Sequence, residues 1–174
     1  MNTANKLTLF RIVLIPVLMA LLYINFPISN YVAMVVFIVA GLTDIADGYI
    51  ARRRGQVTDF GKFLDPLADK ILVIAAMLWF VECDVMPAWV ALIVIVREFM
   101  VTGLRLVAVD TGRVIAAGLL GKIKTGVTMV CLTAMFLPLT TWMLYTCLAA
   151  ITVTTLISGV EYFVRNKDLL NWKK

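Results

Sequence analysis

Four aspartates have the spacing that most directly indicates chemistry: Asp44, Asp47, Asp65 and Asp69. Offsets of three and four residues place each pair on one face of a helix. They lie within apolar segments, and an ionised aspartate at a bilayer centre costs roughly 2.5–3.5 kcal/mol even on a lenient scale. Converging carboxylates need cations, and oxygen ligands without histidine or cysteine suit Mg²⁺ or Mn²⁺. We therefore predict a two-metal site able to hold a phosphoryl group and its leaving oxygen.

A second interpretation of these acids is a solvated rim in which they only pair with nearby basic residues, namely Arg52, Arg53, Arg54, Lys62 and Lys70. Asp59, which we expect in the middle of a loop, suits that interpretation. Gly48 and Gly61 would let a ligand approach the metals closely. Small residues that allow tight helix packing explain the two glycines equally well.

The elements that must position these acids are membrane helices. Hydrophobic residues make up 62% of the 174-residue chain and charged residues 16%, whereas a soluble domain is about half apolar and about a quarter charged. Long charge-free runs are broken at residues 25–30 and 138–141. We expect an all-α polytopic membrane protein, a single domain over residues 1–174. Its six transmembrane helices are predicted near 7–25, 31–51, 63–81, 86–109, 120–137 and 142–163.

The distribution of basic residues predicts the orientation. Lys and Arg concentrate in the segments 1–11, 52–62, 110–124 and 164–174. The turns on the other side contain only Glu82 and Asp84 as charged residues. Because basic residues stay on the cytoplasmic side, both termini are expected in the cytoplasm. The net charge of +5 then reflects topology and lipid headgroups, and we expect no nucleic-acid partner.

Histidine is absent from the sequence. This excludes histidine metal sites, histidine general bases and Ser-His catalysis. The three cysteines, Cys83, Cys131 and Cys147, show no CxxC spacing. They predict neither a disulfide framework nor a redox pair.

Residues 44–69 contain the pattern Asp44-x2-Asp47-Gly48-x2-Ala51-Arg52-x8-Gly61-x3-Asp65-x3-Asp69. All its specified positions match, and the pattern resembles the signature of the CDP-alcohol phosphotransferase family. The resemblance implies six transmembrane helices, a homodimer and a site for two divalent cations at the cytoplasmic boundary. It also implies displacement of CMP from a CDP-alcohol by an acceptor hydroxyl group.

Shorter motifs are similar to a bacterial branch of that family, the phosphatidylglycerophosphate synthases. They are the segment from Asn5 to Arg11 followed by Ile15-Pro16, then Arg97-Glu98, Gly103-Leu104-Arg105 and the run from Gly121 to Thr125. This similarity implies transfer of the phosphatidyl group from CDP-diacylglycerol to sn-glycerol 3-phosphate, giving phosphatidylglycerol phosphate and CMP. The implied location is the bacterial cytoplasmic membrane, with the active site facing the cytoplasm.

The resemblance also assigns roles to single residues. Asp44, Asp47 and Asp65 would bind the metals, and Asp69 would be both metal-associated and the general base. A base is needed because a glycerol hydroxyl is a poor nucleophile until its proton leaves. The cytidine nucleotide would contact Gly48, Ala51, Arg52 and Gly61, with Thr58 and Lys62 as further members.

The basic residues of the later spans have two interpretations each. Arg105, Lys122 and Lys124 form either a pocket for the acceptor's phosphate or a positive flank at the cytoplasmic end. Arg97 lies eight residues before Arg105 and close to the same helix face. Its structural interpretation is a pair with Glu98 or with an acid of another helix.

Other functions stay open at this point. Within the family, inositol phosphate, serine or phosphatidylglycerol could be the acceptor, although several cations favour a phosphorylated one over serine. Outside it, intramembrane charges could belong to a small cation transporter, whose site would be expected near the midplane of the bilayer. Metal-dependent release of CMP would distinguish the enzyme from the transporter.

Overall fold

The computed structural model describes the backbone of residues 3–24, 26–54, 59–110 and 118–167; within these ranges it describes side chains except those of 3–8, 44–54, 59–67, 69 and 109–110. This part of the chain contains six α-helices and no strand. The helices are α1 (Thr3–Ile24), α2 (Ser29–Arg54), α3 (Asp59–Glu82), α4 (Ala88–Asp110), α5 (Leu119–Met135) and α6 (Thr141–Arg165). The predicted all-helical class and number of helices are therefore confirmed.

The predicted breaks also occur. A turn at Pro27 and Ile28 separates α1 from α2, as expected where proline cannot donate a backbone hydrogen bond. The second predicted break lies between Met135, where α5 ends, and Thr141, where α6 begins. A further turn at Asp84 joins α3 to α4, and the φ angle of Asp84 is 58°. This is the left-handed region, which aspartate tolerates better than most residues because its short side chain can bond locally.

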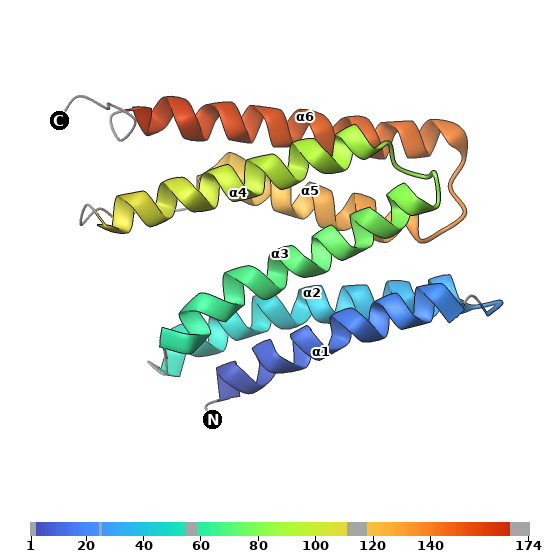
Figure 1. Ribbon diagram of the computed structural model, residues 1–174, viewed down its shortest axis with the longest axis horizontal. Helices are drawn as coiled ribbons and strands as arrows, with labels where there is room; N and C mark the ends of the chain where they lie inside the picture. The colour runs from blue at the N-terminus through green and yellow to red at the C-terminus, as the bar shows by residue number, and fades with distance from the viewer. Residues whose placement is uncertain (1–2, 25, 55–58, 111–117, 168–174) are drawn as a thin grey trace. The chain divides into compact units, whose positions relative to one another are not determined.

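The chain divides into two compact units, which we describe separately. The first comprises Met1–Val85 and Leu132–Pro138. Within it α1 packs against α2 and α3, and α2 also contacts α3 (Figure 1). The fully buried Phe37 and the largely buried Phe80 hold the ring of Phe136 between them, with ring centres 5.6 and 4.9 Å from it.

The second unit comprises Met86–Cys131 and Leu139–Lys174. In it α4 and α6 lie side by side and run in the same direction (Figure 1). Val101, Leu104 and Tyr162 form a buried cluster between them, against which Phe163 packs.

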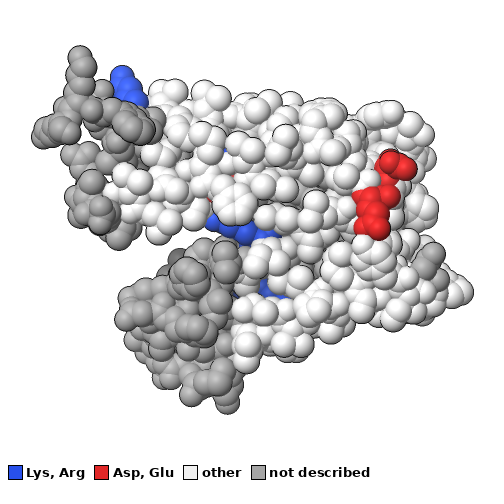
Figure 2. Space-filling model, in the orientation of Figure 1, with Lys and Arg blue, Asp and Glu red and all other residues white. Residues whose placement is uncertain are grey.

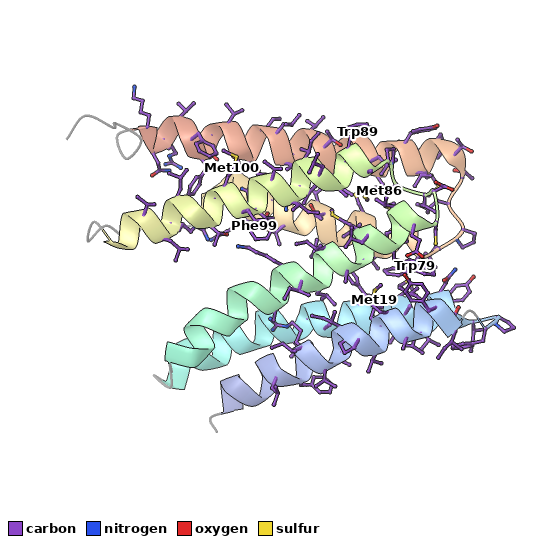
Figure 3. All side chains as sticks on the ribbon, viewed as in Figure 1. Met19, Trp79, Met86, Trp89, Phe99 and Met100 are labelled. Carbon is purple, nitrogen blue, oxygen red and sulfur yellow. The ribbon has the colours of Figure 1, made fainter. Side chains whose placement is uncertain are left out.

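The described surface is largely apolar. Figure 2 shows a face on which most drawn atoms belong to uncharged residues. On α4, Trp89, Phe99 and Met100 are exposed (Figure 3), and on α6 Trp142 is 69% exposed. Large exposed apolar areas are uncommon on soluble monomers and are expected where lipid or another protein covers them.

One helix of the described residues, Thr141–Arg165, is by itself long and apolar enough to cross a membrane. Two shorter apolar helical stretches are Leu9–Ile24 and Ser29–Thr43. The number of spans and the side on which the termini lie stay predictions.

Candidate active site

The signature acids lie on two helices that pack against each other in the first unit. Asp44 and Asp47 belong to α2, and Asp65 and Asp69 belong to α3. Each pair has the offset that places both members on one helix face. Aspartates offer only oxygen ligands, the type that hard divalent cations prefer.

The helices that carry the signature are longer than the predicted spans. α2 continues to Arg54 and α3 begins at Asp59, so Arg52 and Lys62 lie on helices and not in the connection. The prediction that Asp59 lies in the middle of a loop was wrong, because it is the first residue of α3. An acidic residue there suits a helix, since the N-terminus carries a partial positive charge.

Most of the predicted site residues have side chains outside the described part of the structure. This holds for Asp44, Asp47, Gly48, Ala51, Arg52, Gly61, Lys62, Asp65 and Asp69, and Thr58 lies outside the described backbone as well. Among the described side chains, no group of three or more His, Cys, Asp or Glu residues could hold a metal ion. The metal and nucleotide roles therefore stay predictions.

Arg11 belongs to the same unit and is completely buried on α1. The basic-flank interpretation of residues 1–11 expects it among lipid headgroups, and for this residue the expectation was wrong. A buried guanidinium is stable only with acceptors around it. The motif from Asn5 to Arg11 contains this residue, but the distribution of basic residues along the chain assigned it to the flank.

Four basic residues of the second unit bear on the predicted phosphate pocket: Arg97, Arg105, Lys122 and Lys124. Three of them belong to two separate groups of contacts. In the first, Arg105 on α4 is exposed; its Nε donates to the hydroxyl oxygen of Tyr162 on α6 at 3.3 Å. The guanidinium carbon lies 5.7 Å from the centre of the tyrosine ring. The tyrosine was not predicted, because it lies 57 residues from Arg105 and no spacing rule connects them.

The second group is a partly buried cluster that we call the Glu98 cluster, made of Arg97, Glu98 and Lys124. One carboxylate oxygen of Glu98 accepts from Arg97 Nη1 at 3.0 Å and from Lys124 Nζ at 2.7 Å. The predicted structural pairing of Arg97 with Glu98 is confirmed. The pairing of Glu98 with Lys124 was not predicted.

Lys122 and Lys124 occupy different environments although only one residue separates them. Positions two apart on an α-helix project about 200° apart. Lys122 is exposed and Lys124 is buried. The structure therefore does not gather Arg105, Lys122 and Lys124 into one group: Arg105 contacts Tyr162, and Lys124 belongs to the Glu98 cluster.

Comparison with known proteins shows which family the sequence matches. The family model described as CDP-alcohol phosphatidyltransferase matches residues 1–157. A CDP-diacylglycerol–glycerol-3-phosphate 3-phosphatidyltransferase of Bacillus subtilis is 42% identical, covering 97% of this chain and 97% of that protein. A probable phosphatidylglycerophosphate synthase of Mycobacterium tuberculosis is 39% identical over 94% of this chain and 81% of its own length. A Rickettsia typhi protein with the same name as the Bacillus enzyme is 38% identical, covering 78% of this chain and 76% of that protein.

Proposed function

The chain belongs to the CDP-alcohol phosphatidyltransferase family, and we propose that it transfers the phosphatidyl group of CDP-diacylglycerol to sn-glycerol 3-phosphate, giving phosphatidylglycerol phosphate and CMP. The observation that carries this proposal is the 42% identity, over nearly the full length of both chains, to a Bacillus subtilis enzyme whose name states that reaction. A small cation transporter is not supported by this relationship.

The proposed reaction exchanges one phosphorus–oxygen bond for another. Asp69 takes the proton of the acceptor's hydroxyl group, which makes the oxygen a better nucleophile. That oxygen forms a bond to the phosphorus that carries the diacylglycerol. The bond from this phosphorus to the CMP oxygen breaks, and CMP leaves with the electron pair.

Two divalent cations, Mg²⁺ or Mn²⁺, belong to the proposal because the acids of α2 and α3 provide only oxygen ligands. Asp44, Asp47, Asp65 and Asp69 are the residues that would hold them. The chemistry they would supply is stabilisation of the negative charge on the pyrophosphate and on the departing CMP.

The nucleotide half of the substrate is assigned to the same two helices. Its proposed contacts are Gly48, Ala51, Arg52, Thr58, Gly61 and Lys62. A glycine lets ligand atoms approach a helix backbone more closely than any other residue. An arginine can receive phosphate oxygens through two parallel hydrogen bonds.

The acceptor's phosphate is assigned to Arg105, Lys122 and Lys124. The exposed positions of Arg105 and Lys122 allow contact with a small anion from solution. Lys124 is buried, so its place in the proposal depends on the Glu98 cluster. Several cations in reach of the acceptor favour a phosphorylated alcohol over serine.

We further propose that all six helices cross the bacterial cytoplasmic membrane, with both termini and the active site on the cytoplasmic side. The exposed apolar residues of α4 and α6 support contact with membrane lipids. At about 1.5 Å per residue, even the 17-residue α5 reaches the lower limit of a spanning helix, about 17 residues. A homodimer is part of the proposal as a family property.

An acceptor screen tests the function. The purified protein is supplied with CDP-diacylglycerol and Mg²⁺, and CMP release is followed with sn-glycerol 3-phosphate, inositol phosphate, serine or phosphatidylglycerol. We expect release to depend on glycerol 3-phosphate. Faster release with another acceptor would assign the protein to a different branch of the family.

A further inference from the structure

The Glu98 cluster joins two helices of the second unit through a partly buried ionic contact. Glu98 and Arg97 lie on α4, and Lys124 lies on α5. The exposed fractions of the three side chains are 19% for Glu98, 11% for Arg97 and 4% for Lys124. Burying a charge is costly unless it is paired, and the Glu98 carboxylate is the partner of the buried Lys124.

Two glycines lie next to the Arg97 side chain. A Cβ atom on Gly159 of α6 would lie 3.3 Å from Cγ of Arg97, which is tighter than an ordinary contact. A Cβ atom on Gly121 of α5 would lie 3.6 Å from Nη2 of Arg97. The Arg97 side chain therefore packs closely against Gly159, where a larger residue would crowd it, whereas Gly121 would accept a Cβ atom at an ordinary contact distance.

The three charges do not balance among themselves. Two cations share one carboxylate oxygen. Among the described residues, Nζ of Lys124 donates to Glu98 only, and the buried Nε of Arg97 has no hydrogen-bond partner. A buried donor without an acceptor is unfavourable. The remaining donors and the surplus positive charge together suit an anion.

We propose that Glu98 is a positioning residue for the acceptor. It holds Lys124 and Arg97 in place so that their remaining N–H groups receive the phosphate of the acceptor. This inference rests on the proposed function and adds Arg97 and Glu98 to the acceptor side of the site. Lysine has a flexible four-carbon stem, so without the carboxylate its ammonium loses its fixed position and the two neighbouring cations repel each other.

The test is steady-state kinetics of the purified full-length protein with Glu98→Gln and Glu98→Asp. Glu98→Gln removes the charge and should raise the KM for glycerol 3-phosphate about 10- to 100-fold, while the KM for CDP-diacylglycerol changes less than about threefold. Glu98→Asp keeps the charge on a shorter side chain and should give an intermediate KM. Glu82→Gln is the matched control, because it makes the same change at an exposed carboxylate in another unit and should leave both KM values unchanged.

Inhibition by inorganic phosphate is a second measurement, and a folding defect would not change it in the same way as the loss of a phosphate contact. We expect it to compete with glycerol 3-phosphate, and Glu98→Gln should weaken this inhibition by the same factor as the KM. If Glu98→Gln does not fold, Lys124→Gln removes the cation that Glu98 holds and leaves Arg97 paired with Glu98, so no buried charge loses its partner. It should show the same raised acceptor KM.

The outcomes separate the inference from the function on which it rests. An acceptor KM that is unchanged or lower in the folded variants, with phosphate inhibition intact, would overturn the role of Glu98. Wild-type protein that releases no CMP with glycerol 3-phosphate would instead overturn the proposed function.

Discussion

The guanidinium of Arg105 and the hydroxyl of Tyr162 connect α4 to α6 through a hydrogen bond of 3.3 Å. Tyr162 is buried, while Arg105 is exposed. The tyrosine therefore holds the Nε edge of the guanidinium on a side chain that is otherwise exposed. This arrangement suits recognition of a phosphate by the two terminal N–H groups.

The first prediction concerns this arginine. Arg105→Ala should raise the KM for glycerol 3-phosphate about 10- to 100-fold, since a charge-assisted hydrogen bond is worth roughly 1.5–3 kcal/mol. Arg105→Lys should recover only part of the loss, because lysine keeps the charge but not the planar fork. Initial-rate kinetics at saturating CDP-diacylglycerol measure both. Normal kinetics per folded molecule, combined with poor membrane insertion, would favour the flank interpretation instead.

The second prediction concerns the signature acids. Asp44→Asn, Asp65→Asn and Asp69→Asn should each lower kcat by about two to three orders of magnitude, the scale expected for the loss of a proton-transfer or charge-stabilising group. Asp59→Asn is the matched control on the same stretch of helix and should stay within about threefold of wild type. Excess EDTA should abolish CMP release. Full activity in EDTA would contradict the metal proposal.

The sequence predicted the number of helices better than it predicted the positions of their ends. Charge-free runs and the prolines at positions 27 and 138 predicted six helices, because a membrane span must be continuous and apolar. The same criterion ended the second span at residue 51, while α2 continues to Arg54. Hydropathy indicates where lipid ends, but arginine is a good helix former and the helix continues beyond that point.

Burial of single cations could not be predicted in the same way. Arg11 was expected to lie in a basic flank, and Lys124 was grouped with Lys122. Arg11 and Lys124 are buried and Lys122 is exposed. Which side of a helix meets its neighbours depends on packing between distant segments. The partner of Lys124 lies 26 residues away, and no local pattern relates the two positions.

The third prediction tests the orientation with a natural thiol. Cys83 is exposed in the turn between α3 and α4. With Cys131 and Cys147 replaced by alanine, an impermeant thiol reagent should label Cys83 in intact cells. In a variant without these three cysteines, Gln56→Cys should react only after the membrane is opened. Labelling of this second variant in intact cells would place the active site on the wrong side for a cytosolic acceptor.

The fourth prediction concerns the reactivity of the same thiol. Partial burial raises the pKa of Cys83, and the carboxylates of Glu82 and Asp84 raise the pKa further. Only the thiolate reacts. The rate of alkylation by iodoacetamide should therefore increase with pH, and the midpoint of this increase should lie at a higher pH than for a cysteine in a short peptide. Glu82→Gln should move the midpoint toward that of the peptide. A midpoint at or below the peptide value would show that these carboxylates do not act on Cys83.

Transfer of the acceptor itself into lipid is the most direct test of the proposed function. Purified protein is incubated with CDP-diacylglycerol, Mg²⁺ and glycerol 3-phosphate labelled in its carbon atoms, and the organic extract is analysed. We expect the label in phosphatidylglycerol phosphate, in equal amount to the CMP released. CMP release without label in the lipid fraction would show that glycerol 3-phosphate is not the acceptor and would contradict the account.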